Sequence, residues 1–156
     1  MTDQISSQSH GRVAIERIFD APRDAVFSAW TDPDQVAQWW GPDGFSTPRE
    51  KVEIDPRLGG RYHVVMIQSG SGAEFPTLCE IVEIVEPELL VLRAAPLPEL
   101  GIPEATTTRV EFHDEGERTR VNFTSGPFTP GPLEQAKAGW TAQLQNMAQL
   151  LEQHST

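Results

Sequence analysis

The sequence has little of several features that particular protein classes require. It holds a single cysteine, Cys79, among 156 residues, which excludes an intrachain disulfide and any paired-cysteine zinc or redox motif. No apolar run approaches the roughly 20 residues needed to span a bilayer. The first twelve residues also lack the apolar stretch of a signal peptide. We therefore expect a protein of the cytoplasm that does not enter or dock on a membrane.

Positive charge is also scarce. There are 12 lysines and arginines against 23 aspartates and glutamates, which gives a formal net charge of −11. Binding to nucleic acid needs a basic surface that replaces the counterions of the phosphates, and anionic lipid likewise attracts basic segments. The charge balance therefore predicts neither a nucleic acid nor a membrane as a partner.

Motifs of catalysis and metal binding are missing as well. The sequence contains no HExxH, no GxSxG and no Walker loop. The four histidines are scattered, which makes a three-ligand metal site improbable. No nucleophile, base and orienting group stand in a recognisable set. We therefore predict no metal, no cofactor and no catalytic residue.

What the sequence does contain is apolar periodicity along most of its length. Residues 1–10 are polar and predict a flexible tail, and residues 11–154 predict one domain. A strand is expected at 12–19. Pro22 then opens a short helix, and Asp32 caps a second helix that Gly41 and Pro42 end.

Alternating apolar residues then predict about six strands. They are expected at residues 52–54, 62–66, 78–85, 89–93, 106–113 and 118–124. The last two form a hairpin around Glu115 and Gly116, with Val110, Phe112, Val121 and Phe123 on one face. A proline-rich loop separates this hairpin from the strand before it.

The chain closes with an amphipathic helix predicted over 132–153. Its apolar stripe recurs every three or four residues. Gly139 interrupts this helix, and we expect a close approach of the helix backbone to the sheet at that point. The element order predicts an α+β fold in which a curved antiparallel sheet grips the long helix, and two short helices close one end. Such packing would leave a cleft between sheet and helix.

Several segments resemble one known family. They are residues 19–33, Gln38-Trp39-Trp40-Gly41-Pro42, Leu58-Gly59-Gly60-Arg61-Tyr62, Glu83-Ile84-Val85-Glu86-Pro87 and Gly139-Trp140. Together they resemble the SRPBCC (START/Bet v 1-like) superfamily and, within it, the family related to the C-terminal domain of the activator of Hsp90 ATPase. The resemblance implies the helix-grip fold and a cavity that holds an apolar small molecule. The proteins that name the family also carry a chaperone-binding domain, for which this chain has no room.

Candidate ligand-binding residues come from the elements expected to line the cleft. They are Phe27, Trp30, Trp39, Trp40, Tyr62, Met66, Glu80, Trp140, Leu144 and Met147. For Phe27 and the four tryptophans ordinary core packing is the simpler explanation, and for Met66, Leu144 and Met147 packing of the helix on the sheet is an equally good one. Trp39 and Trp40 point about 100° apart on a helix, so one can pack inward while the other faces the cleft or solvent. Glu80 lies in an apolar strand and would have a raised pKa if it pointed inward, although an outward carboxylate is the simpler alternative.

Three functions stay open at this point. The first is a domain that binds an apolar or aromatic small molecule. The second is an enzyme of cyclase, dehydratase or hydrolase type acting on an aromatic or polyketide-like substrate, which would need at least two ionisable groups facing the cleft. The third is an interaction protein, either a chaperone partner or a homodimer that uses an exposed Trp39 or Trp40 and the loop 97–102.

Overall fold

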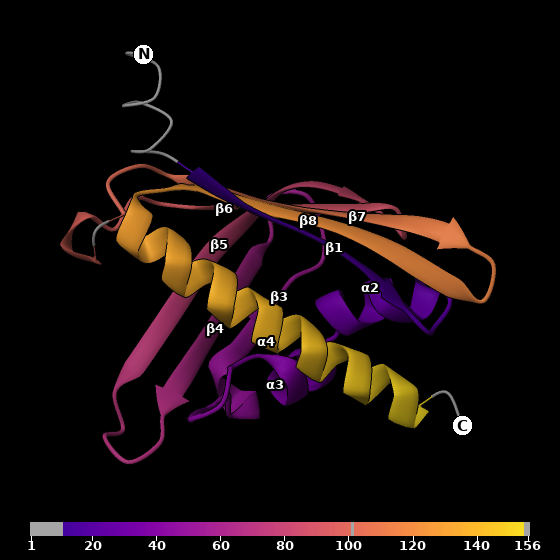
Figure 1. The fold of residues 1–156 in the computed structure, drawn as a ribbon, viewed down its shortest axis with the longest axis horizontal. Helices are drawn as coiled ribbons and strands as arrows, with labels where there is room; N and C mark the ends of the chain where they lie inside the picture. The colour runs from indigo at the N-terminus through magenta and orange to yellow at the C-terminus, as the bar shows by residue number, and fades with distance from the viewer. Residues whose placement is uncertain (1–10, 101, 155–156) are drawn as a thin grey trace.

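An eight-stranded antiparallel sheet forms the body of the computed structural model, which describes residues 11–100 and 102–154 (Figure 1). The strand order is β1-β8-β7-β6-β5-β4-β2, and β3 also pairs with β4. The strands are β1 (Gly11–Phe19), β2 (Phe45–Ser46), β3 (Val52–Ile54), β4 (Arg61–Gln68), β5 (Glu74–Val85), β6 (Leu89–Ala94), β7 (Thr106–Glu115) and β8 (Arg118–Phe128). The α-helices are α2 (Arg23–Thr31), α3 (Pro33–Trp39) and α4 (Pro130–His154), and short 3-10 turns lie at Arg49–Lys51 and Pro98–Leu100.

The helices all lie on one side of the sheet. Figure 1 shows α4 running across the inner face, with α2 and α3 at one end. Helix α4 packs chiefly against β1, β8, α2 and α3. This arrangement confirms the predicted α+β helix-grip fold.

The two short helices begin as their sequence predicts. Pro22 precedes α2, and Asp32 caps α3 by accepting a 3.0 Å hydrogen bond from the backbone N–H of Asp34. The side-chain amide of Gln35 donates to the same carboxylate over 3.1 Å. The bond from Asp34 satisfies a backbone donor that a helix start leaves free, and the bond from Gln35 holds the capping carboxylate in place, so α3 can begin immediately after α2 ends.

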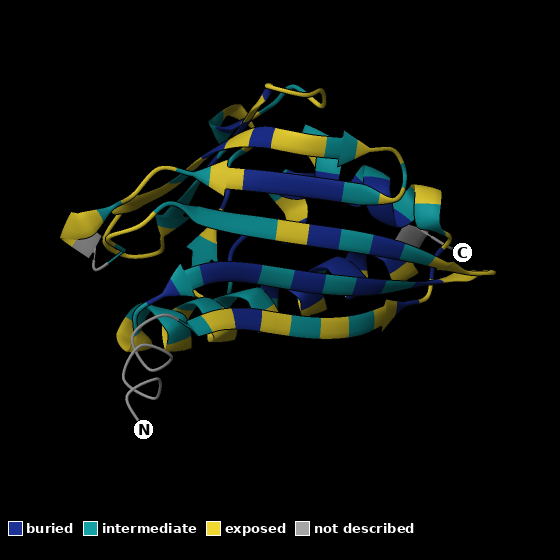
Figure 2. Ribbon diagram, turned by 90° about the horizontal axis from the view of Figure 1, so that it is seen from above, coloured by how far each residue is buried: buried dark blue, intermediate teal, exposed yellow. Residues whose placement is uncertain are grey.

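The sheet alternates between a buried inner face and a wetter outer face. Val110, Phe112, Val121 and Phe123 are buried on the inner side of the β7–β8 hairpin, as the alternation predicts. Figure 2 shows the outer side, where buried and exposed bands follow one another along the strands. No helix in the described part of the chain is long and apolar enough to cross a membrane.

Three local features differ from the sequence expectation. Strand β5 begins at Glu74 and passes through Pro76, a residue that usually ends a strand. The proline is tolerated there because β6 pairs with β5 only from Cys79 onward, so the missing N–H lies in a stretch with one free edge. The short β2 was not expected, and α4 begins two residues earlier than the pattern predicts. The expected tail, residues 1–10, lies outside the described residues.

The expected close approach at Gly139 is wrong. A Cβ atom placed on Gly139 would have no heavy atom within 4 Å outside the local helix backbone. The glycine therefore faces open space rather than the sheet.

Candidate functional site

Four tryptophans meet between the sheet and the helices. Trp30 from α2 lies with its ring centroid 5.0 Å from that of Trp39 and 5.6 Å from that of Trp140 on α4. Trp40 approaches Trp140 edge-on at 5.1 Å, and Phe123 of β8 lies 4.6 Å from the same ring. These offset and edge-on contacts are favourable beyond the burial of the rings themselves. The rings occupy space that the sequence analysis expected to be a cleft.

Most of the candidate residues are therefore part of the core. Trp30, Trp39, Tyr62 and Met147 have no exposed surface, and Leu144 is 1% exposed. Phe27 is also buried and packs edge-on against Phe112 with ring centroids 5.2 Å apart. The expectation that Trp39 or Trp40 is exposed for a partner is wrong, since Trp40 is only 5% exposed.

The tryptophan cluster is fixed by hydrogen bonds to the ends of α2 and α3. The hydroxyl of Tyr62 donates to the backbone carbonyl of Trp30 over 2.5 Å. The indole N–H of Trp39 donates to the backbone carbonyl of Ala29 over 2.8 Å. Both carbonyls belong to the last turn of α2, where helix carbonyls lack partners in the helix. The Tyr62 hydroxyl therefore satisfies a carbonyl at the end of α2 and is not free to bond to a ligand.

Helix α4 supplies a second set of bonds, to the turn after α3. The side-chain oxygen of Gln143 accepts a 3.0 Å bond from the backbone N–H of Gly41, and the amide of Asn146 donates to the Gly41 carbonyl over 3.0 Å. Thr47 donates to the carbonyl of Trp40 over 2.7 Å. Gln143 and Asn146 were not singled out from the sequence. The only signal was two amide residues near the apolar stripe of an amphipathic helix.

Two titratable groups stand side by side within the core. Tyr62 of β4 and Cys79 of β5 are direct partners in the sheet. Burial raises the pKa of the Tyr62 phenol, and burial raises the pKa of the Cys79 thiol to about 12. Both groups are therefore neutral near pH 7, and no aspartate, glutamate, histidine, lysine or arginine among the described residues is buried.

Glu80 does not face the concave side. It is exposed on the outer side of β5, between Arg61 of β4 and Arg93 of β6 in the register of the sheet. The inward alternative for Glu80 is wrong, because Cys79 and Ile81 on either side take the buried positions.

Only two of the candidate residues, Met66 and Trp140, remain partly exposed to the concave side. Met66 lies on the inner face of β4, toward the free end of the β4–β5 hairpin and beyond the main contacts of α4. In Figure 1 this hairpin points away from α4. Phe75 lies opposite Met66 in the sheet register, is 40% exposed, and contacts Phe45 edge-on at 5.5 Å. We call this surface the open corner; its apolar members are Phe45, Met66 and Phe75.

Sequence reasoning missed Phe45 and Phe75 at this corner. Phe75 precedes the strand predicted at 78–85, and Phe45 lies in a two-residue strand that was not predicted. The aromatic residues themselves were the available signal, but their placement depends on strand lengths that the prolines conceal.

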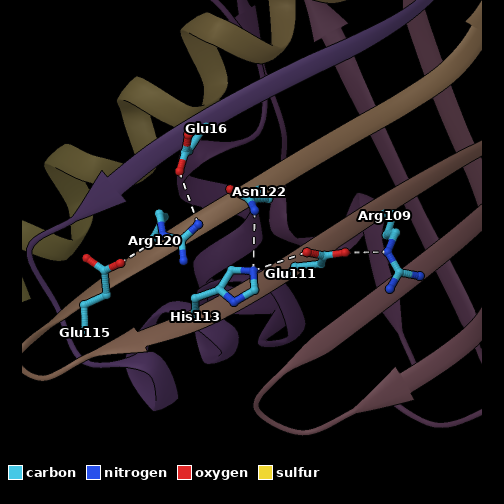
Figure 3. Close-up of polar contacts among 7 residues, drawn as sticks. All are labelled: Glu16, Arg109, Glu111, His113, Glu115, Arg120 and Asn122. Carbon is cyan, nitrogen blue, oxygen red and sulfur yellow. Dashed lines mark hydrogen bonds and ion pairs between the residues drawn. The ribbon is translucent and has the colours of Figure 1, made fainter.

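The outer face carries a polar network of its own (Figure 3). Glu111 accepts bonds from Arg109 at 2.8 Å and lies 3.2 Å from the imidazole Nε2 of His113. Arg120 joins Glu115 at 2.9 Å and Glu16 at 3.3 Å, across β7, β8 and β1. The hydrogen bond from Arg109 is the largest cause of the lowered pKa of Glu111. These charges satisfy one another, so the network accounts for the wet face of the sheet and indicates no reaction.

The fold places this chain in the helix-grip class of α+β domains. The family model of activator of Hsp90 ATPase homolog 1-like protein matches residues 20–152, nearly the whole chain, and the chain therefore belongs to this family. No curated protein matches the chain.

Solved structures agree in fold. Protein CV1439 from Chromobacterium violaceum superposes with a TM-score of 0.81 at 24% identity, over 90% of this chain and 96% of that one. The AHSA1-like protein from Aeromonas hydrophila gives 0.78 at 24% identity, over 93% and 94%. The AHSA1 protein from Silicibacter pomeroyi gives 0.75 at 20% identity, over 92% and 99%. At these identities the similarity shows the fold alone.

Proposed function

We propose that this protein binds an apolar or aromatic small molecule at the open corner. Membership of the family supports a ligand-binding domain in general. The observation that carries the finer proposal is the unequal burial of α4. Its C-terminal half buries Leu144, Met147, Leu150 and Leu151, whereas no residue from 130 to 142 is buried.

This asymmetry has a structural cause. Helix α4 packs on β1 and β8, and the inner faces of β4–β6 lie beyond its main contacts. Apolar side chains at the free ends of these strands are therefore left with partial exposure. An apolar molecule that covers them gains about 25 cal/mol for each Å² it removes from water.

The proposed site has two parts. The tryptophan cluster, which reaches β4 through Trp40 and Tyr62 with ring centroids 6.2 Å apart, forms the rigid support. Phe45, Met66 and Phe75 form the part that contacts the ligand, and methionine adjusts to irregular shapes more easily than a stacked ring does. Phe27, Trp30, Trp39, Trp40, Tyr62, Leu144 and Met147 then support the site from behind rather than touching the ligand.

The enzyme alternative finds less support. The inner-face groups closest in type to an acid or a nucleophile are Tyr62 and Cys79, and burial raises the pKa of both. Neither is ionised near neutral pH, and general acid–base catalysis works best with a pKa close to the working pH. The chaperone-partner and homodimer hypotheses, and the cytoplasmic location, stay predictions.

A fluorescent apolar amine, N-phenylnaphthylamine, tests the proposal by titration. The variants are Phe75→Gln and Met66→Gln, which place an amide in the open corner. The matched control is Leu78→Gln, because Leu78 lies on the same strand, is 53% exposed, and faces the outer side. We expect saturable enhancement for the wild type and for Leu78→Gln, and binding at least about tenfold weaker for the corner variants.

The opposite pattern would overturn the proposal. Enhancement that never saturates, or that is unchanged by Phe75→Gln and Met66→Gln, means that the dye does not occupy the open corner. Circular dichroism of each variant shows whether the fold is retained, so that loss of binding is not confused with loss of structure.

A further inference from the structure

A surface hollow lies between α4 and β1. Its volume is about 600 Å³, and it is lined by Arg17 of β1 and by Glu134, Lys137, Ala138, Ala142 and Gln145 of α4, with Thr141 at the same surface. The open corner lies on β2, β4 and β5, which are at the other side of the sheet from β1. The two surfaces are therefore separate.

Arg17 occupies an unusual position in this hollow. It lies on the same inward face of β1 as Val13 and Phe19, so its side chain starts between strand and helix and is half-buried. Its guanidinium donates to the side-chain oxygen of Gln145 over 2.5 Å and lies 5.7 Å from the ring of Phe19. Its Nε is buried with no hydrogen-bond partner in the described part of the chain.

Arg17 also lacks a counter-charge among the described residues. No aspartate or glutamate among the described residues lies within ion-pair distance of Arg17, although the chain is strongly acidic. Arginines on the outer face, such as Arg109 and Arg120, do have carboxylate partners. A half-buried guanidinium that bonds only to a neutral amide has lost water without gaining a counter-charge, which is unfavourable.

Lys137 adds a second unpaired cation to the same hollow. It forms no ion pair with any described carboxylate, including Glu134, which lines the hollow one turn earlier. The hollow therefore holds two positive charges and one negative charge, in a protein whose net charge is −11. The amide nitrogen of Gln145 is a further donor beside the guanidinium.

We infer that this hollow binds a small organic anion, a monocarboxylate with a short apolar body. The carboxylate lies between the guanidinium of Arg17 and the ammonium of Lys137, since the planar fork of arginine matches the two oxygens of a carboxylate. The apolar body lies over Ala138 and Ala142, whose small side chains leave space for it beside the helix. The negative field of the whole protein favours a single charge over a phosphate with two.

Hexanoate and its neutral counterpart hexanamide test this inference without a variant. Amide correlation NMR spectra of the isotopically labelled full chain are recorded during titration with each compound to roughly 20 mM. We expect saturable shifts for hexanoate at amides of β1 near Arg17 and of α4 from 134 to 145, and much smaller shifts for hexanamide.

Two variants and a control locate the charge effect. Lys137→Gln, on the exposed surface of α4, and Arg17→Gln are each expected to weaken hexanoate binding at least about tenfold. Arg93→Gln removes the same charge from the outer face of β6 and is expected to leave binding unchanged. Lys137→Gln keeps the test valid if Arg17→Gln does not fold.

Three results would each overturn the inference. They are shifts that do not saturate, equal binding of hexanamide, and binding that survives Lys137→Gln. Shifts confined to amides near Met66 and Phe75 would also overturn it, because hexanoate would then occupy the open corner. That last result would still be compatible with the proposed function, so the two proposals fail separately.

Discussion

Gly139 gives the sharpest test of how α4 sits on the molecule. It lies in the interior of a 25-residue helix, and a Cβ atom added there would have open space around it. Alanine is favoured over glycine at such a position by about 1 kcal/mol, because glycine loses more backbone freedom on helix formation. We therefore expect Gly139→Ala to raise the free energy of unfolding by about 1 kcal/mol, or the melting temperature by about 2–4 °C for a domain of this size.

The same substitution at Gly60 provides the matched contrast. A Cβ atom on Gly60 would lie 2.0 Å from the carbonyl oxygen of Asp55 and 2.9 Å from that of Arg57. Both atoms belong to the backbone of a tight turn that hydrogen-bonds to Ile81 of β5. Because neither can move without breaking this turn, we expect Gly60→Ala to cost at least about 2 kcal/mol.

Urea denaturation followed by far-ultraviolet circular dichroism measures both variants against the wild type. The reasoning predicts opposite signs for one chemical change, so errors common to both titrations cannot produce the result. A neutral or destabilising Gly139→Ala would refute it, because some group would then have to occupy the space beside Gly139. A tolerated Gly60→Ala would refute the geometry of the turn.

Three further outcomes follow from single contacts. Tyr62→Phe leaves the carbonyl of Trp30 without its donor, so urea denaturation should show a loss of about 1–3 kcal/mol. The pKa of Glu111 is lowered in the folded state, so its contribution is present above its unfolded pKa of about 4.3 and disappears as the pH falls through the folded value. The stability difference between the wild type and Glu111→Gln should therefore shrink on acidification below about pH 4; a difference that stays constant down to acid pH would contradict this. Because the pKa of Cys79 is about 12, only about one thiol in ten thousand is ionised at pH 8, so a thiol-reactive disulfide should label the native protein far more slowly than the urea-unfolded protein.

The elements that sequence patterns predicted well are those whose signals are local. The cap at Asp32, the alternation in the β7–β8 hairpin and the long stripe of α4 each depend on residues within one or two turns or strands. The start of β5 could not be predicted in this way. Whether Pro76 can lie in a strand depends on where β6 stops pairing, and that is a property of the sheet rather than of residues 74–77.

The candidate site was predicted less completely, for a related reason. Residue type identified the tryptophans, but it could not show whether four such rings fill a space or only line it. Each ring needs about 150–250 Å² of cover, and here Trp30, Trp39, Trp40 and Trp140 supply it to one another. Glu80 illustrates the converse case, since a one-residue change of strand parity decides between the core and solvent.

The hydrogen bonds around Gly41 explain why one half of α4 can remain uncovered. Gln143 and Asn146 bind the turn after α3, and the buried leucines that follow them bind the C-terminal half of the helix to the core. With one half fixed by both polar and apolar contacts, the other half needs no complete apolar cover to stay helical, because helix extension is far less costly than helix nucleation. The residues of the open corner are therefore freer of a packing role than those of the cluster behind them. If the open corner binds a ligand, its specificity can change through Phe45, Met66 and Phe75 while Trp39, Gly41 and Gln143 continue to hold the fold.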